Sequence, residues 1–257
     1  MAVRYIRSGD VSLALETRGH GPRGLLFAHG WISSRRMWYE LAAHLDETAF
    51  TLHLLDFRGC GTSDRPAEGH DLAGYASDLR AALDSIAGPV TLIGHSMGGK
   101  VAQFVALERP ANVRDLVLVA PGTAAAHATS PGHRATAFAA FGSRVRIARF
   151  VRGAMRHDVA PHVFERLVDD ALLAQREHWF GWYDDGRGAD FSAELHRLEL
   201  PTVIVAGDND PLAPARLLRR EVADRIPGAL FVTFKGCGHN LPVEAPAPLA
   251  QLLGRLL

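Results

Sequence analysis

The sequence predicts an α/β protein built on a mostly parallel, eight-stranded twisted sheet that is flanked by helices. Apolar runs of strand length alternate with amphipathic segments of helix length along most of the chain. A serine framed by glycines directly follows one of these runs, and residues 122–198 interrupt the alternation. With 257 residues and 47% hydrophobic content, the chain can bury one sizeable core without requiring a second independent domain.

The strands are predicted from short apolar and β-branched runs bounded by turn residues. Residues 3–7 and 11–17 are expected to form an opening hairpin. The further predicted strands are 24–28, 51–56, 90–93, 113–119, 202–206 and 230–234. Because the last five are mostly continuous apolar runs, we expect them to be central strands covered on both faces.

Helices are predicted between the strands from apolar residues at helical spacing. The predicted helices are 37–45, 72–86, 97–108, 213–226 and 246–257. Residues 122–198 contain no convincing strand but several amphipathic stretches rich in arginine, histidine and aromatic residues. We therefore expect residues 1–121 and 199–257 to form the core, and 122–198 to form a helical cap inserted after the sixth strand.

Composition excludes several classes of partner. The 28 basic and 28 acidic side chains give a formal net charge of zero, so no overall field favours nucleic acid or an anionic membrane. Cys60 and Cys237 have no spacing typical of a disulfide framework or metal site and are expected to be free thiols. The sequence contains no apolar run typical of a signal peptide or membrane span, and we expect a cytoplasmic protein. Its oligomeric state is left open.

The serine at position 96 has the setting of a nucleophile elbow. Residues 90–93 form an apolar run, Gly94 and Gly98 frame Ser96, and a helical pattern follows. A tight turn from strand to helix needs small residues on both sides of the serine, because side chains there would collide with neighbouring segments. The pattern predicts a strained, accessible nucleophile.

A serine hydroxyl needs a base and a group that orients the base. His239 follows the last predicted strand on a glycine-rich loop and is the best-placed base, whereas the side chain of His95 should point away from the nucleophile. The strand 202–206 ends in a loop that contains Asp208 and Asp210. We favour Asp210 as the acid, because it lies far enough beyond the strand to accept the Nδ1 hydrogen of His239, and assign Asp208 to the turn.

Two backbone N–H groups are expected to bind the oxyanion that develops during acyl transfer. Met97 supplies one from the first turn after the nucleophile, where the helix N-terminus also favours negative charge. Trp31 is expected to supply the other from the loop after the strand 24–28, with Gly30 allowing close approach.

With these motifs, the chain resembles the α/β-hydrolase fold superfamily, in particular its capped serine esterase- and lactonase-like branch. The motifs are His29-Gly30-Trp31, Asp56-Phe57-Arg58-Gly59-Cys60-Gly61-Thr62-Ser63, Gly94-His95-Ser96-Met97-Gly98-Gly99, Gly207-Asp208-Asn209-Asp210 and Gly238-His239-Asn240-Leu241-Pro242-Val243-Glu244. The chain order Ser96, Asp210, His239 is that of this fold. The resemblance implies a catalytic triad of these residues, and it implies that the loop from Asp56 to Ser63 is structural.

Departures from particular subfamilies narrow the activity. Epoxide hydrolases and haloalkane dehalogenases of this fold have aspartate where Ser96 stands. Carbon–carbon bond hydrolases usually have Gly-Pro-Gly in the oxyanion loop and tryptophan after the histidine, where this chain has Trp31-Ile32-Ser33 and Asn240. Cofactor-free haloperoxidases tend to have proline at the position of Ile32.

The predicted function is hydrolysis of small carboxylic esters or lactones, with no cofactor and no metal. The alternatives are hydrolysis of carbon–carbon bonds in β-diketones or ring-fission products, and a catalytically silent receptor for a small ligand. Substrate contacts are expected from Trp31, Leu212, Leu241, Trp179, Phe180 and Trp182. Five cap arginines at positions 144, 146, 149, 152 and 156 have the spacing of a solvated helix face, although a role in binding a carboxylate is the alternative.

Overall fold

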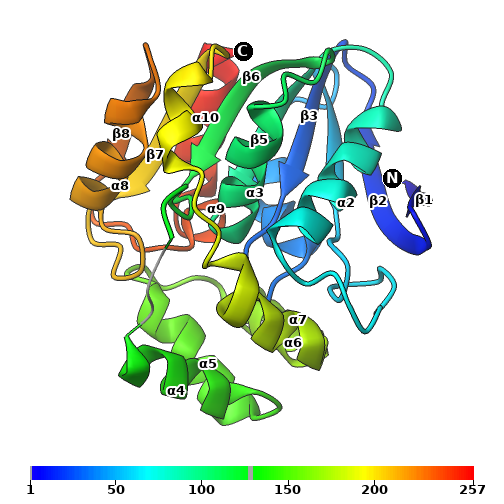
Figure 1. Ribbon diagram of the computed structural model, residues 1–257. Helices are drawn as coiled ribbons and strands as arrows, with labels where there is room; N and C mark the ends of the chain where they lie inside the picture. Colours follow the sequence, from blue (N-terminus) through cyan, green and yellow to red (C-terminus); the bar gives the residue numbers. More distant parts are fainter. Residues whose placement is uncertain (1, 127–129) are drawn as a thin grey trace.

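One eight-stranded sheet runs through the molecule in the order β1-β2-β4-β3-β5-β6-β7-β8 (Figure 1). The computed structural model describes residues 2–126 and 130–257. The strands are β1 (Ala2–Ser8), β2 (Val11–Gly19), β3 (Arg23–Ala28), β4 (Phe50–Leu55), β5 (Val90–His95), β6 (Val113–Val119), β7 (Thr202–Gly207) and β8 (Leu230–Phe234). The eight-stranded α/β architecture predicted from the sequence is therefore confirmed.

Strand direction brings the ends of the central strands to one edge of the sheet. The pairs β1–β2 and β2–β4 are antiparallel, and all pairs from β4 to β8 are parallel. Ala28 at the end of β3 pairs with Gly94, which in turn pairs with Leu118. The loops that follow β3, β5, β6 and β7 therefore start close together, as expected for a site at the carboxyl edge of a parallel sheet.

Helices cover both faces of the sheet, and neighbouring residues of β5 show why. Leu92 packs into a core that includes Tyr75 of α2 (Leu72–Asp84) and Val101 of α3 (Met97–Ala106). Ile93 packs into a second core with Leu249 of α10 (Pro246–Leu256). The alternation of side chains along a strand places apolar residues on both faces of the sheet. The helices of this part are η1 (Arg35–Trp38), α1 (Tyr39–Ala42), α2 (Leu72–Asp84), α3 (Met97–Ala106), α8 (Ala215–Glu221), η4 (Ala223–Arg225), α9 (Leu241–Glu244) and α10 (Pro246–Leu256).

The insertion between β6 and β7 is helical in the residues that the structure describes. Its elements are α4 (Pro131–Ala140), α5 (Arg144–Ala154), α6 (Pro161–Leu173), α7 (Arg176–Gly181), the single-turn π-helix η2 (Trp182–Gly186) and η3 (Ser192–Arg197). Helices α4 to α7 lie together at one end of the molecule, below the sheet in Figure 1. The division into a core of residues 1–121 and 199–257 and a cap of residues 122–198 remains our proposal.

Three expected elements differ from the observed ones. The strand β8 is not central but forms an edge of the sheet, and Leu230 at its start is 55% exposed. The helix expected at 37–45 begins earlier, as the 3₁₀ turn η1, because Ser34 caps it by accepting a hydrogen bond from the Arg36 amide, and it ends at Ala42. The helix expected at 213–226 is interrupted at Val222, whose backbone leaves the helical region.

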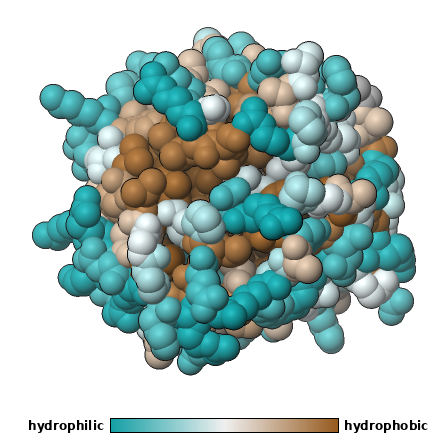
Figure 2. All heavy atoms as spheres, turned by 90° about the horizontal axis from the view of Figure 1, so that it is seen from above, coloured by the Kyte–Doolittle hydropathy of each residue, from teal (hydrophilic) through white to brown (hydrophobic). Residues whose placement is uncertain are grey.

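The surface is hydrophilic around smaller apolar areas. Figure 2, which views the molecule from above, shows a broad apolar area and several smaller ones among hydrophilic residues. Among the described residues, large hydrophobic side chains that remain exposed include Leu230 of β8 and Leu256 of α10. None of the helices in residues 2–126 and 130–257 combines the length and apolar character that a membrane crossing would need.

Candidate active site

Ser96 occupies a sharp turn between β5 and α3. Its backbone angles are φ 51° and ψ −115°, a conformation that residues other than glycine rarely adopt. A Cβ atom on Gly94 would lie 2.5 Å from the Gly98 carbonyl oxygen, and one on Gly98 would lie 2.4 Å from the Ala28 carbonyl oxygen. Backbone approaches on both sides of Ser96 therefore require glycine, which is the physical reason for the sequence pattern.

Ser96, His239 and Asp210 lie in one chain of hydrogen bonds. His239 Nε2 is 2.9 Å from Ser96 Oγ, and His239 Nδ1 is 2.7 Å from Asp210 Oδ2. The other Asp210 oxygen accepts hydrogen bonds from the amides of Leu212, at 2.7 Å, and Ala213, at 2.9 Å. Although burial raises the pKa of Asp210, the neighbouring His239 and these amides outweigh it and hold the pKa below its usual range. The carboxylate is thus ionised and fixed in place.

Asp208, the other aspartate of this loop, has a different position. Its Oδ1 atom accepts a hydrogen bond from the Gly236 amide at 2.6 Å, and the residue is exposed. This contact joins the loop after β7 to the turn before His239. Of the two aspartates, only Asp210 contacts the imidazole of His239 in the described residues.

Two residues that the sequence analysis did not select hold the loop that carries His239. Glu244 accepts hydrogen bonds from the amides of Gly238 and Asn240, both at 2.9 Å, so its carboxylate spans the histidine. The buried His95 has its Nε2 atom 2.9 Å from the carbonyl oxygen of His239. Burial lowers the pKa of His95 to about 3, so the ring is neutral and its Nε2–H donates to this carbonyl. The glutamate in the motif around His239 was the available signal.

The amides expected to bind an oxyanion belong to Trp31 and Met97. Met97 is the first residue of α3, and Trp31 follows Gly30 on the loop after β3. A Cβ on Gly30 would lie 2.7 Å from His95 Nδ1 and 3.2 Å from Ser96 Cβ, so glycine lets this loop approach the elbow. Within the part of the chain that the structure describes, neither N–H has a protein acceptor. Both therefore remain available to a ligand.

A buried polar chain supports the next residue of this loop, Ile32, whose φ is 49°. His70 Nε2 is 2.8 Å from the Pro66 carbonyl oxygen, which can only accept, so this nitrogen carries the hydrogen. Burial lowers the pKa of His70, and its Nδ1 atom therefore accepts from the Tyr75 hydroxyl at 3.2 Å. The direction of every further bond in the chain follows from this end.

The chain continues through His178 of α7. The Tyr75 oxygen accepts from His178 Nδ1 at 2.6 Å, which leaves His178 Nε2 as an acceptor. This nitrogen accepts from the Ile32 amide at 3.4 Å and from the Cys60 thiol at 3.3 Å. Burial lowers the pKa of His178 and raises that of Cys60, so both groups stay neutral. His178, a residue of the inserted segment, thus accepts a hydrogen bond from the loop that carries the Trp31 amide.

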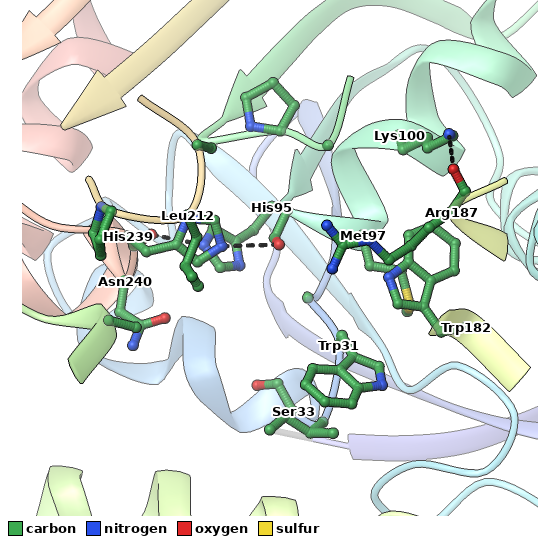
Figure 3. Close-up of a pocket in the computed structure, with 18 of the residues that line it drawn as sticks. Trp31, Ser33, His95, Met97, Lys100, Trp182, Arg187, Leu212, His239 and Asn240 are labelled. Atoms are coloured by element: carbon green, nitrogen blue, oxygen red, sulfur yellow. Dashed lines mark hydrogen bonds between the residues drawn. The ribbon is translucent and has the colours of Figure 1, made fainter. Parts of the chain in front are cut away.

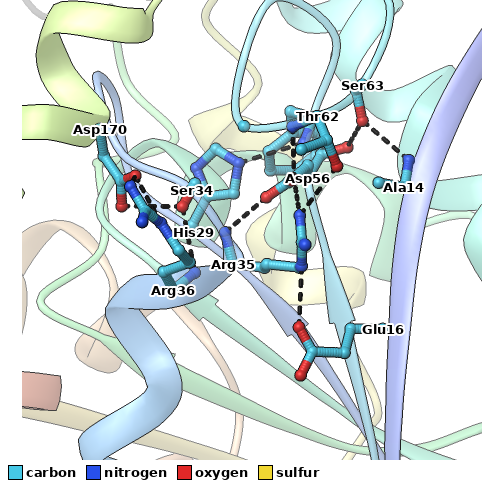
Figure 4. A network of polar contacts seen from close by, with 12 residues as sticks. Ala14, Glu16, His29, Ser34, Arg35, Arg36, Asp56, Thr62, Ser63 and Asp170 are labelled. Carbon is cyan, nitrogen blue, oxygen red and sulfur yellow. Dashed lines mark hydrogen bonds and ion pairs between the residues drawn. The ribbon is translucent and has the colours of Figure 1, made fainter. Parts of the chain in front are cut away.

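A charged network joins β2, η1 and the segment that follows β4 (Figure 4). Asp56 accepts from the Arg35 amide at 2.6 Å and from the Thr62 amide at 3.0 Å, and it pairs with the Arg35 guanidinium. Arg35 also bonds Glu16 at 2.9 Å. The Ser63 hydroxyl donates to the Asp56 carbonyl at 2.7 Å. These bonds agree with the structural role expected for the segment from Asp56 to Ser63.

A cavity of about 420 Å³ opens over Ser96 (Figure 3). Three of the expected contact residues line it: Trp31, Leu212 and Trp182. The other three do not line it in the described structure. Leu241 and Trp179 are fully buried in the core, and Phe180 packs edge-on against Phe138, with ring centroids 4.5 Å apart. Trp179 and Phe180 therefore pack the inserted helices together, whereas Phe150, Trp182 and Tyr183 of the same segment line the cavity.

The basic residues of the cavity were also missed by the sequence analysis. Lys100 of α3 and Arg187, just after η2, line it. The arginines of α5 that were considered instead lie elsewhere, as the solvated-face interpretation expects. Arg144 pairs with Asp169 and Glu165, and all three side chains are about half exposed. Arg187 stands alone between two glycines in the sequence, where no periodic pattern marks it.

Comparisons with known proteins agree with the fold. The model of the alpha/beta hydrolase family matches residues 25–252. Lipase LipV of Mycobacterium tuberculosis is 34% identical over 91% of this chain and 92% of its own length. The AB hydrolase superfamily protein YisY of Bacillus subtilis is 28% identical over 98% and 97%. An esterase from Exiguobacterium antarcticum superposes with a TM-score of 0.89 at 21% identity, over 98% of both chains. The chain belongs to the alpha/beta hydrolase family.

Proposed function

We propose that this chain is a serine hydrolase that cleaves small carboxylic esters or lactones through an acyl-enzyme intermediate. One observation carries the proposal: His239 lies within hydrogen-bond distance of both Ser96 Oγ and Asp210 Oδ2 at the floor of a cavity. This is the arrangement of nucleophile, base and orienting acid that acyl transfer by serine requires. The similarity to a relative named a lipase supports an ester substrate.

In the proposed first step, Ser96 Oγ attacks the carbonyl carbon while His239 Nε2 takes the hydroxyl proton. Asp210 stays ionised, holds the proton on Nδ1 and stabilises the imidazolium. The amides of Trp31 and Met97 donate to the oxyanion, and each such donor typically contributes about 3 kcal/mol to transition-state stabilisation. As the tetrahedral intermediate collapses, the bond to the leaving oxygen breaks and His239 protonates that oxygen.

In the second step, a water molecule attacks the acyl group while His239 takes its proton. Collapse of the second intermediate returns the proton from His239 to Ser96 Oγ and releases the acid. The same sequence opens a lactone, with the leaving alcohol still attached to the acyl group. Apart from the substrate and water, every step uses groups that the chain itself supplies, so no cofactor or metal enters the proposal.

The decisive experiment compares wild type with Ser96→Ala on p-nitrophenyl esters of increasing chain length, beside a lactone and a β-diketone. We expect Ser96→Ala to lower kcat by roughly 10⁶ on esters. A phosphonate ester should add its phosphonyl group to Ser96 and be found there by mass spectrometry. Ester turnover that survives Ser96→Ala would overturn the proposal. Turnover of the diketone alone would move the activity to carbon–carbon bonds, and binding without turnover would indicate a receptor.

A further inference from the structure

Besides three histidines, His95, His133 and His239, the ionisable side chains that line the cavity are a lysine and an arginine. Lys100 and Arg187 line it, and no aspartate or glutamate does so among the described residues. Residues 1 and 127–129, which the structure does not describe, contain no aspartate or glutamate in the sequence. Asp210 lies behind His239 and is already engaged by it. The cavity therefore presents positive charge to a bound molecule without a neutralising carboxylate in its wall.

Lys100 uses its ammonium group on the protein itself. Its Nζ atom donates to the carbonyl oxygens of Ala189 at 2.6 Å, Arg187 at 3.2 Å and Ala125 at 3.3 Å. Burial lowers the pKa of Lys100 to about 8. With three donors and three carbonyl acceptors, the group is satisfied, and it ties the main chain at Ala125 to the main chain at Arg187 and Ala189. Lys100 thus positions Arg187 more than it offers hydrogen bonds to a ligand.

Several arginines of the insertion have no acidic partner among the described residues. Of these, Arg146, Arg149, Arg156 and Arg176 are exposed, whereas Arg187 is partly buried and lines the cavity. Figure 3 shows its side chain extending into the cavity beside Met97 and Trp182. Its guanidinium carbon lies 4.8 Å from the centroid of the Tyr183 ring, and no carboxylate of the described residues lies within ion-pair distance. By contrast, Arg134 on the outer surface pairs with Asp184. Tyr183 packs against the guanidinium, and its hydroxyl is a neutral hydrogen-bond partner for it, so Arg187 has a polar contact but no negative charge beside it.

A partly buried guanidinium without a carboxylate is costly, since burial weakens hydration of the charge. The same cause lowers the pKa of Arg187, although an arginine remains charged at any physiological pH. A ligand that brings a carboxylate would supply the missing partner. The planar fork of arginine matches a carboxylate by two parallel hydrogen bonds, and a single cation balances a single negative charge.

Resting on the serine-hydrolase function proposed above, we infer that the substrate carries a carboxylate in addition to its ester or lactone group and that Arg187 binds this carboxylate. Arg187 is then a specificity-determining residue. It sets which acyl groups are presented to Ser96, whereas Ser96, His239 and Asp210 perform the chemistry on any of them.

The test uses two p-nitrophenyl esters of one shape. The first is the mono-p-nitrophenyl ester of adipic acid, whose free carboxylate is too far from the ester to cleave it readily by itself. In the second, a carboxamide replaces that carboxylate. A charge-assisted hydrogen bond contributes 1.5–3 kcal/mol, so wild type should favour the first ester in kcat/KM by roughly tenfold to hundredfold. Arg187→Gln should bring the ratio to about one, and Arg187→Lys should give an intermediate ratio because it keeps the charge and loses the fork.

Arg134→Gln is the matched control, because it removes an arginine of the inserted segment that is paired on the surface. It should keep the wild-type ratio. The inference is overturned if wild type does not distinguish the two esters or if Arg187→Gln keeps the preference. Should Arg187→Gln fail to fold, competitive inhibition of wild type by adipate monoamide but not by adipamide supports the inference, and equal inhibition overturns it.

The same measurements separate this inference from the proposed function. If neither ester is hydrolysed in a manner that depends on Ser96, the proposed function fails. Calorimetric binding of adipate monoamide and adipamide to Ser96→Ala then still tests the carboxylate site. Binding of the monoamide at least tenfold tighter supports the site, and equal affinities contradict it.

Discussion

The two walls of the cavity over Ser96 are built differently. On the wall formed by the strand ends, Asp210, His239 and His95 each have a defined partner, and the hydrogen bonds run in one direction. On the wall formed by the inserted helices, Arg187 has no acidic partner among the described residues, and most neighbours are aromatic or apolar. On the first wall, Ser96, His239 and Asp210 are paired with one another, and the Trp31 and Met97 amides stay open to a ligand. On the second wall, the cation of Arg187 has no counter-ion among the described residues. We propose that the residues on the wall of strand ends carry out the reaction, and that the residues on the wall of inserted helices determine which substrate binds.

The largest loss of activity from a change on the first wall is expected for Asp210→Asn. The amide keeps the size of the side chain but removes its charge, so it favours the wrong tautomer of His239 and no longer stabilises the imidazolium. We expect kcat to fall about 10⁴-fold for every ester, whether or not it carries a carboxylate. Asp208→Asn is the matched control, since among the described residues the Asp208 side chain bonds only the Gly236 amide, and its effect should be far smaller. Equal losses in the two variants would contradict the assignment.

The first wall was also the part that the sequence predicted well. Gly94, Ser96 and Gly98 stand in one short segment because the turn itself requires them there, so the chemistry leaves a local pattern. His239 and Asp210 follow predicted strands, and parallel strands bring their following loops to one edge. The order and direction of the strands therefore explain much of why His239 and Asp210 lie close together.

The second wall could not be predicted in the same way. Trp179 and Phe180 have the aromatic character of pocket residues but pack inside the insertion, whereas Arg187 has no distinctive spacing. Which face of an inserted helix meets the cavity depends on tertiary packing, and helical periodicity alone cannot distinguish a cap core from a cavity lining. The role of His95 was missed for a similar reason, because its partner is a backbone carbonyl 144 residues away.

A backbone change on the first wall should cost stability as well as activity. In Gly98→Ala the new Cβ would lie 2.4 Å from the Ala28 carbonyl oxygen, an atom that cannot rotate away. We expect the free energy of unfolding to fall by about 3 kcal/mol, as measured by denaturant titration. Gly153→Ala in α5 provides the contrast, because nothing lies within 4 Å of its Cβ position and helix propensity should add up to about 1 kcal/mol. Similar destabilisation in both variants would contradict the difference between the walls.

The buried His95 predicts loss of stability in mild acid. Its pKa in the fold is about 3, below the ordinary value of 6.5, so the unfolded chain takes up a proton first as the pH falls. The stabilisation is complete above pH 6.5 and decreases toward pH 3. Between pH 6.5 and 5 this one group should cost about 2 kcal/mol. His95→Gln keeps an N–H donor for the His239 carbonyl without titrating, so its unfolding free energy should depend less on pH. Identical pH profiles for the variant and wild type would count against this origin.

The smallest expected effect concerns His178. This residue belongs to the inserted helices, but like the residues of the first wall it has hydrogen-bond partners within the protein at both ring nitrogens. Its Nε2 atom accepts from the Ile32 amide, next to the Trp31 amide that is proposed to bind the oxyanion. His178→Phe keeps a ring and removes the acceptor, so the loop loses its fixed position and kcat should fall roughly tenfold on both the carboxylate and the carboxamide ester. KM and the preference between the two esters should stay nearly constant.

The conservative variant His178→Gln separates positioning from packing. The glutamine carbonyl can accept from the Ile32 amide, so part of the lost kcat should return even though the ring is absent. A packing role alone would give the opposite order, with Phe closer to wild type than Gln. If either variant changed the preference between the two esters, His178 would contribute to substrate selection, as proposed for the wall formed by the inserted helices. The loop that bears Trp31 is joined to α7 by two hydrogen bonds, from Trp31 Nε1 to the Trp179 carbonyl at 3.1 Å and from the Ile32 amide to His178 at 3.4 Å. These bonds let the insertion contact substrate while the amides that face Ser96 keep their position.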